Sequence, residues 1–355
     1  MNIGILTFHR AINYGAVLQA YALQETLRSL GHEVWVIDYR QPRVERTDRR
    51  TYHSNDKINL LKGFHLRSWL NFDETKKRTL AIRERFDNFL HKHINLTKPC
   101  TQESIPSMDA YIIGSDQVWN SAICEGLDPV FWGNFKHEDT SIILSYAAST
   151  SVKDLQKQTK EKLQTYLNNF KYVSVREQAT CNYLNETFKL GNEVQTVLDP
   201  TLLAEKNIWD CFDDKKYGNK EYVLYFGARS CKEYPTVLYD KAHSLAKKYG
   251  CEAISINFNE DTPEDFVNKF RHAKAIVTSS FHGVAFSIIF NRPLYAVLYG
   301  DEQDARYANV LKSVGAEDML VTLNQDIIPK EYDYTIINQQ INTVRNKSLN
   351  YIRQI

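Results

Sequence analysis

Residues 275–294 combine an apolar run, a small polar turn and a helix pattern, and this combination restricts the fold more than any other stretch. Ala275–Val277 is typical of a short buried strand. The helix after it is expected to begin at Phe281 or His282 and to end before Pro293, because proline stops a helix. A buried strand that turns directly into a helix is one unit of a parallel α/β sheet. The polar turn is therefore expected at the carboxyl end of a strand.

The turn itself has the composition of an anion site. Backbone N–H groups of the first helical turn, expected at Gly283 and Val284, would direct the positive end of the helix dipole at a ligand. Ser279 and Ser280 can donate to an anion, and Gly283 would let it approach the backbone closely. His282 adds a group that titrates near neutrality. The structural alternative is that the serines are ordinary helix caps and that His282 only satisfies a loop.

The alternation of strands and helices recurs along most of the chain. Expected strands cover residues 2–7, 33–38, 109–114, 140–150, 172–178, 195–203, 221–226, 252–256, 275–277 and 293–298. Expected helices cover residues 16–30, 71–93, 152–170, 237–249, 262–269, 281–291 and 305–314. A length of 355 residues favours two domains. We predict two Rossmann-like, doubly wound parallel-sheet domains at residues 1–204 and 219–325, joined by the charged segment 204–218 and followed by a helical extension at 326–355.

The alternation weakens between residues 40 and 101. Residues 43–50 are basic and are expected to form a loop that could close over an acidic acceptor. The helix expected at 71–93 is strongly charged, and the simplest interpretation of these charges is a solvated surface. Its apolar face is expected to consist of Leu80, Phe86, Phe89 and Leu90.

The loop after the first strand lacks a Gly-x-Gly-x-x-Gly pattern, so a dinucleotide fingerprint is absent. It carries polar residues at the carboxyl edge of the sheet, where open α/β sheets bind ligands. These residues are His9, Arg10, Asn13, Tyr14 and Gly15. The alternative is that Asn13 only caps the following helix.

Two further strand ends carry candidate site residues. Gly114 ends a buried strand, and Ser115 and Asp116 then offer a hydroxyl and a carboxylate, unless Asp116 is a helix cap. Arg176 leaves another buried strand, which is costly unless the side chain is paired or faces a polar site. Its planar fork matches a carboxylate or a phosphate. A salt bridge to Glu177 is disfavoured, because adjacent strand residues point to opposite faces.

Composition excludes several classes of protein. The formal net charge of +1 gives no general attraction to nucleic acid or anionic lipid. The six cysteines stand singly, without metal-ligand spacing, which favours reduced thiols and no metal site. No apolar run approaches the roughly 18–20 residues that span a bilayer, and the chain starts in a strand without a secretion signal. A cytoplasmic protein with no transmembrane segment and no nucleic-acid partner is expected, with many of the 21 tyrosines available to line a carbohydrate-sized cleft.

Five separated blocks, taken in order, resemble the polysaccharide pyruvyl transferase family. The blocks are residues 13–23, Gly114–Trp119, Val175–Arg176, Leu198–Thr201 and Ser279–Gly283. The resemblance implies two Rossmann-type domains in a glycosyltransferase-B-like arrangement. It also implies transfer of the enolpyruvyl unit of phosphoenolpyruvate to two hydroxyls of a sugar, forming a ketal on a cell-surface glycan such as an exopolysaccharide or a capsule. Phosphoenolpyruvate is then a co-substrate, and no cofactor is expected.

The same resemblance places His282 and Arg176 at the donor site. The donor carries a carboxylate and a phosphate, so cationic and N–H partners are needed, and C3 must receive a proton from a group that titrates near neutrality. Asp116 is the candidate that orients or deprotonates the acceptor hydroxyl. Ser279, Ser280, Gly283 and Arg306 complete the expected donor site, and Asn13, Tyr14, Gly15 and Ser115 the expected acceptor site. Replacing His282 or Arg176 by alanine is expected to abolish transfer and to change the melting temperature by only a few degrees.

Two other functions stay open at this point. A glycosyltransferase of the same build would use the turn at Ser279–Gly283 for the pyrophosphate of a nucleotide sugar and Asp116 as its base. A catalytically silent glycan-binding subunit would need neither. Many members of the family have a run of glycines where this chain has Gly114, Ser115 and Asp116, so the acceptor or the reaction can differ here. The sequence does not decide the acceptor sugar, whether that sugar is lipid-linked, or whether the chain forms a homo-oligomer.

Overall fold

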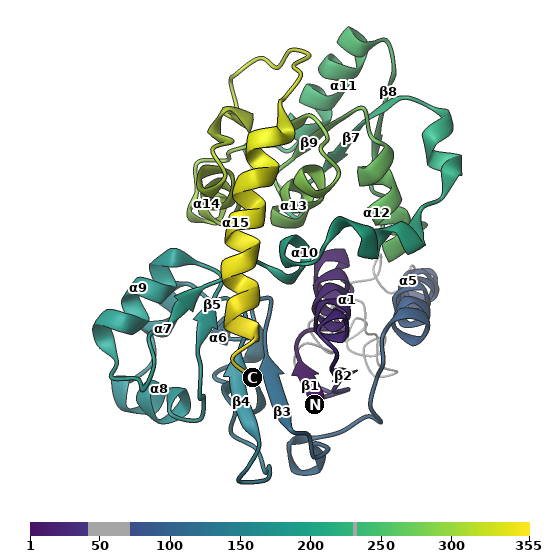
Figure 1. The fold of residues 1–355 in the computed structure, drawn as a ribbon. Coiled ribbons are helices and arrows are strands. Elements are labelled where there is room, and N and C mark those ends of the chain that lie inside the picture. Colours follow the sequence, from purple (N-terminus) through teal and green to yellow (C-terminus); the bar gives the residue numbers. More distant parts are fainter. Residues whose placement is uncertain (42–71, 230–232) are drawn as a thin grey trace, which may run out of the picture. The chain divides into compact units, whose positions relative to one another are not determined.

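The computed structural model describes residues 1–41, 72–229 and 233–355. The chain forms two compact units (Figure 1). Unit 1 consists of Met1–Pro200, Phe258–Pro263 and Gln354–Ile355, and unit 2 of Thr201–Asn257 and Glu264–Arg353. The basic loop expected at residues 43–50 lies outside the described residues.

Unit 1 is built on parallel strands (Figure 1). The strands are β1 (Asn2–Leu6), β2 (Glu33–Val36), β3 (Ala110–Ile113), β4 (Ile142–Ser145), β5 (Ser174–Val175) and β6 (Gln195–Thr196). The helices are α1 (Tyr14–Ser29), α5 (Phe72–His93), α6 (Ser121–Cys124), α7 (Val152–Leu155), α8 (Lys160–Leu167) and α9 (Gln178–Thr187). The main sheet has the order β2-β1-β3-β4, and parallel bridges from Leu144 to Tyr172 and from Ala148 to Val175 continue it toward the β5-β6 pair.

The core of unit 1 is rich in aromatic side chains. Trp119 and Trp132 are fully buried and stack with their ring centroids 4.4 Å apart. Phe86 and Phe89 of α5 are buried as expected, and so is Leu90. The expectation for Leu80 is wrong, because its side chain is 55% exposed and Thr79 is buried instead. Among the described side chains of α5, the buried apolar face begins at Ile82 and continues to Leu90.

Two expected elements of unit 1 are shorter than the sequence indicated. Residues 152–170 form α7 and α8, and not one helix, because Ser151 and Thr159 each cap a separate helix start. The strand expected at 195–203 ends at Thr196, and Pro200 begins the short helix α10 (Pro200–Leu203). Proline suits the first position of a helix because its fixed φ is helical and that position needs no N–H.

Unit 2 is a second parallel sheet, with the order β11-β10-β9-β7-β8 (Figure 1). Its strands are β7 (Tyr222–Phe226), β8 (Glu252–Ser255), β9 (Ala275–Thr278), β10 (Leu294–Val297) and β11 (Leu320–Val321). Its helices are α11 (Val237–Tyr249), α12 (Pro263–His272), α13 (Phe281–Ile289), α14 (Ala305–Ser313) and α15 (Tyr334–Ile352). The helical extension expected at the end of the chain is α15, which lies in unit 2.

The charged segment expected as a linker is packed into unit 2. It forms the short 3-10 helices η3 (Lys206–Phe212) and η4 (Lys215–Asn219). Trp209 is fully buried, and its ring lies 4.9 Å from that of Phe286 in α13. The boundary between the two compact units therefore follows Pro200 and lies before this segment begins.

Both units have the strand order of a doubly wound Rossmann-like fold, which confirms the expected fold class. In each sheet the second strand is added on one side of the first strand and the third strand on the other side. The strand order therefore reverses between β1 and β3 in unit 1 and between β7 and β9 in unit 2. Loops at such a switch point diverge, and open α/β sheets bind ligands there, at the carboxyl ends of the strands. Ligand contacts in each unit are therefore expected from the residues that follow these strands. Within the described ranges, no helix has the length and apolar character that crossing a membrane requires.

Candidate functional site

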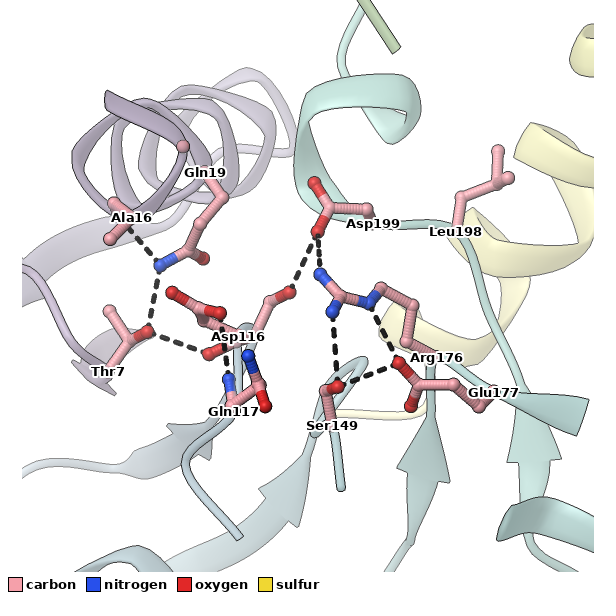
Figure 2. Close-up of polar contacts among 12 residues, drawn as sticks. Thr7, Ala16, Gln19, Asp116, Gln117, Ser149, Arg176, Glu177, Leu198 and Asp199 are labelled. Carbon is pink, nitrogen blue, oxygen red and sulfur yellow. Dashed lines mark hydrogen bonds and ion pairs between the residues drawn. The ribbon is translucent and has the colours of Figure 1, made fainter. Parts of the chain in front are cut away.

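Arg176 is the centre of a polar cluster at the carboxyl edge of the unit 1 sheet (Figure 2). It follows β5 directly, and its side chain is only 7% exposed. The Nη1 atom donates to Asp199 Oδ2 at 3.0 Å, Nε to Glu177 Oε1 at 3.2 Å and Nη2 to Ser149 Oγ at 3.1 Å. The guanidinium charge is thus balanced inside unit 1 by two carboxylates.

Asp199 connects this arginine to the loop after β3. Its side chain is fully buried, and Oδ2 also accepts a hydrogen bond from Ser115 Oγ at 3.2 Å. The carbonyl oxygen of Ser115 in turn accepts from Thr7 Oγ1 at 2.9 Å, across the switch point between β1 and β3. Gln19 of α1 donates to Thr7 Oγ1 at 2.8 Å (Figure 2). One chain of hydrogen bonds therefore fixes the loops that follow β1, β3, β5 and β6.

The electrostatic environment of Arg176 is acidic. Burial alone lowers the pKa of its guanidinium, but the negative charges of Glu177, Asp199 and Asp116 outweigh burial and raise that pKa above its ordinary value. Asp116 is therefore close enough to interact with Arg176. The structure brings together three residues that the sequence singled out, namely Ser115, Asp116 and Arg176.

The expectation that Glu177 would not pair with Arg176 is wrong. It assumed a strand through residues 172–178, in which neighbouring side chains alternate between faces. The strand ends at Val175, and Glu177 is already the N-cap residue of α9. The backbone has left the sheet, so both side chains can turn toward the same point.

Asp116 has an unusual backbone conformation, with φ at +71°. Its Oδ1 accepts the backbone N–H of Gln117 at 2.8 Å, which stabilises the turn, and helix α6 is capped by Asn120 instead. The alternative that Asp116 is a helix cap is therefore wrong. Gly114 precedes this turn with φ at +119°, and a side chain there would overlap with the carbonyl oxygen of Tyr146. The tight approach expected at Gly114 is thus made by the protein's own backbone.

The expected acceptor residues at the start of α1 have structural roles in unit 1. Asn13 Oδ1 accepts the N–H groups of Gly15 and Ala16, at 2.9 and 3.3 Å, so the capping alternative describes its contacts. Tyr14 is 1% exposed, and its hydroxyl donates to the carbonyl oxygen of Asp261 at 3.0 Å. Its ring centroid lies 4.7 Å from that of Phe258. A role in acceptor binding for Asn13, Tyr14 and Gly15 stays a prediction.

The helix mouth in unit 2 forms where the sequence placed it. Helix α13 begins at Phe281, and Ser280 is its N-cap, with Oγ 3.5 Å from the N–H of Gly283. The N–H of Val284 bonds to the carbonyl oxygen of Ser280 at 3.0 Å. The expectation that Gly283 and Val284 present free N–H groups is therefore wrong, because both groups are used within the first turn.

The glycine at position 283 is required by packing. A Cβ atom there would overlap with the Oγ1 atom of Thr278 in β9, because strand and helix approach closely. Ser279 Oγ donates to the Tyr299 hydroxyl at 3.1 Å. His282 is half-buried at the same turn, with its ring 5.2 Å from that of Phe281.

Arg229 is a charged residue at this edge that the sequence analysis missed. It follows β7, and its guanidinium lies 4.8 Å above the ring of Tyr299. It pairs with Asp301 and, at 2.6 Å, with the buried Asp304. An arginine beyond a buried strand was the signal used for Arg176, and it applied equally here. Arg306 of α14, expected at the donor site, is half-buried.

A second cluster in unit 1 surrounds Asp38, which follows β2. Its carboxylate contacts His9 Nε2 at 3.1 Å, Arg10 Nε and Nη2 at 2.8 and 2.7 Å, and Arg40 Nη2 at 3.0 Å. Burial raises the pKa of Asp38, but hydrogen bonds and charge from His9 and Arg10 dominate and hold it well below its usual range. The polar residues that the sequence placed after β1 are thus tied to the end of β2.

The predicted pairing of His282 with Arg176 joins residues of different units, and it stays a prediction. Among the residues that the structure describes, no group of three or more histidine, cysteine, aspartate or glutamate side chains is arranged to hold a metal ion. The described cysteines are free thiols.

Two Rossmann-like units, each with charged and hydroxyl-bearing loops at the carboxyl edge of its sheet, define an α/β protein of two domains. The family model described as polysaccharide pyruvyl transferase matches residues 13–301. The chain therefore belongs to the polysaccharide pyruvyl transferase family, which indicates a transferase in polysaccharide modification.

Solved structures with a similar course of the chain are distant in sequence. The UDP-GlcNAc 2-epimerase from Neisseria meningitidis bound to UDP-GlcNAc is 12% identical, with a TM-score of 0.45 and 100% of both chains covered. The UDP-GlcNAc 2-epimerase from Methanocaldococcus jannaschii is 10% identical, with a TM-score of 0.43, 98% of this chain and 93% of that chain covered. The spinosyn rhamnosyltransferase SpnG is 11% identical, with a TM-score of 0.42, 100% of this chain and 96% of that chain covered. No curated protein matches the chain in sequence.

Proposed function

We propose that the protein is a pyruvyl (ketal) transferase that moves the enolpyruvyl unit of phosphoenolpyruvate onto two hydroxyls of a sugar in a polysaccharide or its precursor. The observation that carries this proposal is the family membership over residues 13–301. The site chemistry supports it. The guanidinium group of Arg176 can bind a carboxylate of the donor through two hydrogen bonds. Proton transfer near neutral pH is suited to a histidine, and His282 is the candidate.

In the proposed reaction, His282 in its protonated form donates a proton to C3 of phosphoenolpyruvate. C2 then has oxocarbenium character, and a sugar hydroxyl oxygen bonds to it while the proton of that hydroxyl passes to Asp116. The bond between C2 and the phosphate oxygen breaks, and phosphate leaves. The second hydroxyl bonds to C2 and its proton leaves with the phosphate, so that one ketal and one inorganic phosphate form from one donor and one diol.

Arg176 holds an anionic group of the donor during these steps, where fixed charges that are preorganised for the transition state contribute most. Ser279, Ser280, Gly283 and Arg306 are proposed to serve the donor in unit 2, and Ser115 the acceptor in unit 1. We propose a cytoplasmic enzyme that uses phosphoenolpyruvate as co-substrate and takes a sugar or glycan as acceptor.

A thermal-shift screen tests the donor, because a ligand that binds the native state raises the melting temperature by mass action. Phosphoenolpyruvate should raise it, and UDP-, GDP- and CMP-sugars should not. Stabilisation by a nucleotide sugar alone would contradict the proposal and indicate a glycosyltransferase. Binding of a glycan without a response to either donor would indicate a silent subunit. Mass spectrometry of candidate acceptors incubated with phosphoenolpyruvate then identifies the sugar by the gain of one pyruvyl group.

A further inference from the structure

The two carboxylates that neutralise Arg176 are held very differently. Asp199 is fully buried, and its Oδ2 atom is shared by Arg176 and Ser115. The Glu177 side chain is 16% exposed, and its contacts to Arg176 Nε and Ser149 Oγ, at 3.2 and 2.7 Å, use a single oxygen, Oε1. If a ligand replaces one of these partners, Glu177 is the one that is accessible from outside, because its side chain is partly exposed whereas that of Asp199 is fully buried.

The second oxygen of Glu177 is poorly satisfied. Oε2 is buried and has no hydrogen-bond donor among the described residues of the chain. A buried carboxylate oxygen without a donor is costly, and native structures contain few of them. The ion pair between Glu177 and Arg176 therefore contributes little net stability, although the buried guanidinium of Arg176 still needs an anionic partner.

Glu177 also has another place for its carboxylate. It is the N-cap residue of α9, with extended backbone angles, yet its side chain makes no capping hydrogen bond. The N–H groups of the first turn of this ten-residue helix favour a negative charge at its N-terminus. A Glu177 side chain displaced from Arg176 can therefore turn to the start of α9 and remain stabilised.

We propose that Arg176 and Ser149 form a carboxylate subsite, that Glu177 fills this subsite in the free protein, and that the carboxylate of the donor takes its place. This inference rests on the proposed function. It assigns the carboxylate of phosphoenolpyruvate, and not its phosphate, to Arg176. A planar carboxylate matches the guanidinium fork and the neighbouring hydroxyl, whereas the larger charge of a phosphate would be repelled by Asp199 and Asp116.

Glu177→Asp and Glu177→Gln separate displacement from a general effect of charge. The aspartate keeps the negative charge but is one methylene shorter, and it is a preferred N-cap residue. The glutamine keeps the length and removes the charge. Glu186→Gln removes one charge from the exposed face of the same helix and is the matched control. Each is titrated with phosphoenolpyruvate, without acceptor, by isothermal calorimetry.

Both Glu177 variants should bind phosphoenolpyruvate about three- to tenfold more tightly than the parent, because a site that is freed from its internal occupant is available for a larger fraction of the time. Glu186→Gln should bind like the parent, and Ser149→Ala more weakly. Tighter binding by Glu177→Gln alone would show a simple charge effect and would overturn the inference, as would unchanged binding in both variants.

Pyruvate, a carboxylate without a phosphate, distinguishes failure of this subsite from failure of the proposed function. If the subsite is correct, pyruvate binding strengthens in Glu177→Asp even if phosphoenolpyruvate is not the donor. If phosphoenolpyruvate supports transfer but neither ligand responds to Glu177→Asp, the function stands and the subsite is wrong. Inorganic phosphate should bind equally to the parent and to Glu177→Asp.

Discussion

Arg176 and His282, the two residues to which the sequence gave the donor, are held in different ways. Arg176 is buried and bonded to two carboxylates and a hydroxyl. His282 is half-buried at the start of α13. Arg176 is therefore part of the packing of unit 1, whatever else it does, whereas His282 is less deeply buried and is expected to contribute less to stability.

Arg176→Ala should consequently destabilise unit 1 by roughly 3 kcal/mol, since it leaves the buried carboxylate of Asp199 without its cation. This differs from the small change of melting temperature that the sequence suggested. His282→Ala should change stability by less than about 1 kcal/mol and still abolish pyruvate incorporation. Urea unfolding measures the stability of each variant, and an assay with phosphoenolpyruvate measures its pyruvate incorporation. Equal stability of Arg176→Ala and the parent would contradict the network described here, and full turnover in His282→Ala would remove that residue from the mechanism.

Residue chemistry was predictable from the sequence only where it depended on local position. A serine before a helix and an arginine after a strand could be recognised, and Ser280 and Arg176 were. The ion pair of Arg176 with Asp199 could not be recognised from the sequence, because Asp199 lies 23 positions away and reaches Arg176 only through the pairing of β5 with β6. The prediction for Glu177 assumed that side chains alternate between the two faces of a strand, and this alternation ends with β5 at Val175.

At the scale of elements, the close packing of α13 on β9 explains the glycine at the helix mouth. Thr278 Oγ1 donates to the carbonyl oxygen of Phe226 at 2.6 Å and accepts the N–H of Ser280 at 3.1 Å. Its side chain thus occupies the space beside Gly283, and it links β7, β9 and the start of α13. The position of His282 depends on this contact.

Gly283→Ala should destabilise unit 2 by about 1–3 kcal/mol, because the added methyl overlaps with Thr278. Thr278→Ala removes the overlapping oxygen, so the double variant should be less destabilised than the sum of the two single variants. Denaturant unfolding of all four proteins measures this coupling. Strict additivity would mean that the helix shifts away from the strand without cost.

Most elements were predictable from the period of apolar residues, and the failures have identifiable causes. The break between α7 and α8 contains neither glycine nor proline, so only the capping residues Ser151 and Thr159 indicated it. The segment 204–218 has the charge of a linker, but Trp209 anchors it in the core. Two buried aromatic residues, Trp209 and Phe212, outweighed the surrounding charges, which periodicity cannot show.

At the scale of the whole molecule, each unit has a hydrophobic cluster of its own among the residues that the structure describes. Residues such as Trp119 and Val130 belong to the first, and Val277 and Leu245 to the second. Calorimetry should therefore resolve two unfolding transitions. Arg176→Ala should lower one of them and Gly283→Ala the other, since each variant acts within one unit. Equal displacement of both transitions by either variant would show that the units unfold together.

Acid stability should depend on Asp38 in unit 1. Its pKa in the folded protein lies below the ordinary value of 3.8, so its pairing stabilises fully above that pH and is lost as the pH falls below it. Asp38→Asn should cost roughly 3 kcal/mol near neutral pH, because the buried carboxylate that pairs with Arg10 and Arg40 is lost. The difference from the parent should shrink toward about pH 3 in urea titrations. A difference that stays constant with pH would contradict this assignment.

The chain passes from one unit to the other more than once. It leaves unit 1 after Pro200, returns for Phe258–Pro263, where Tyr14 contacts Phe258 and Asp261, and returns again at Gln354. A protease that nicks the backbone at residue 200 would therefore not release two independent fragments. Neither half can be excised by a single cut without losing residues that complete the other.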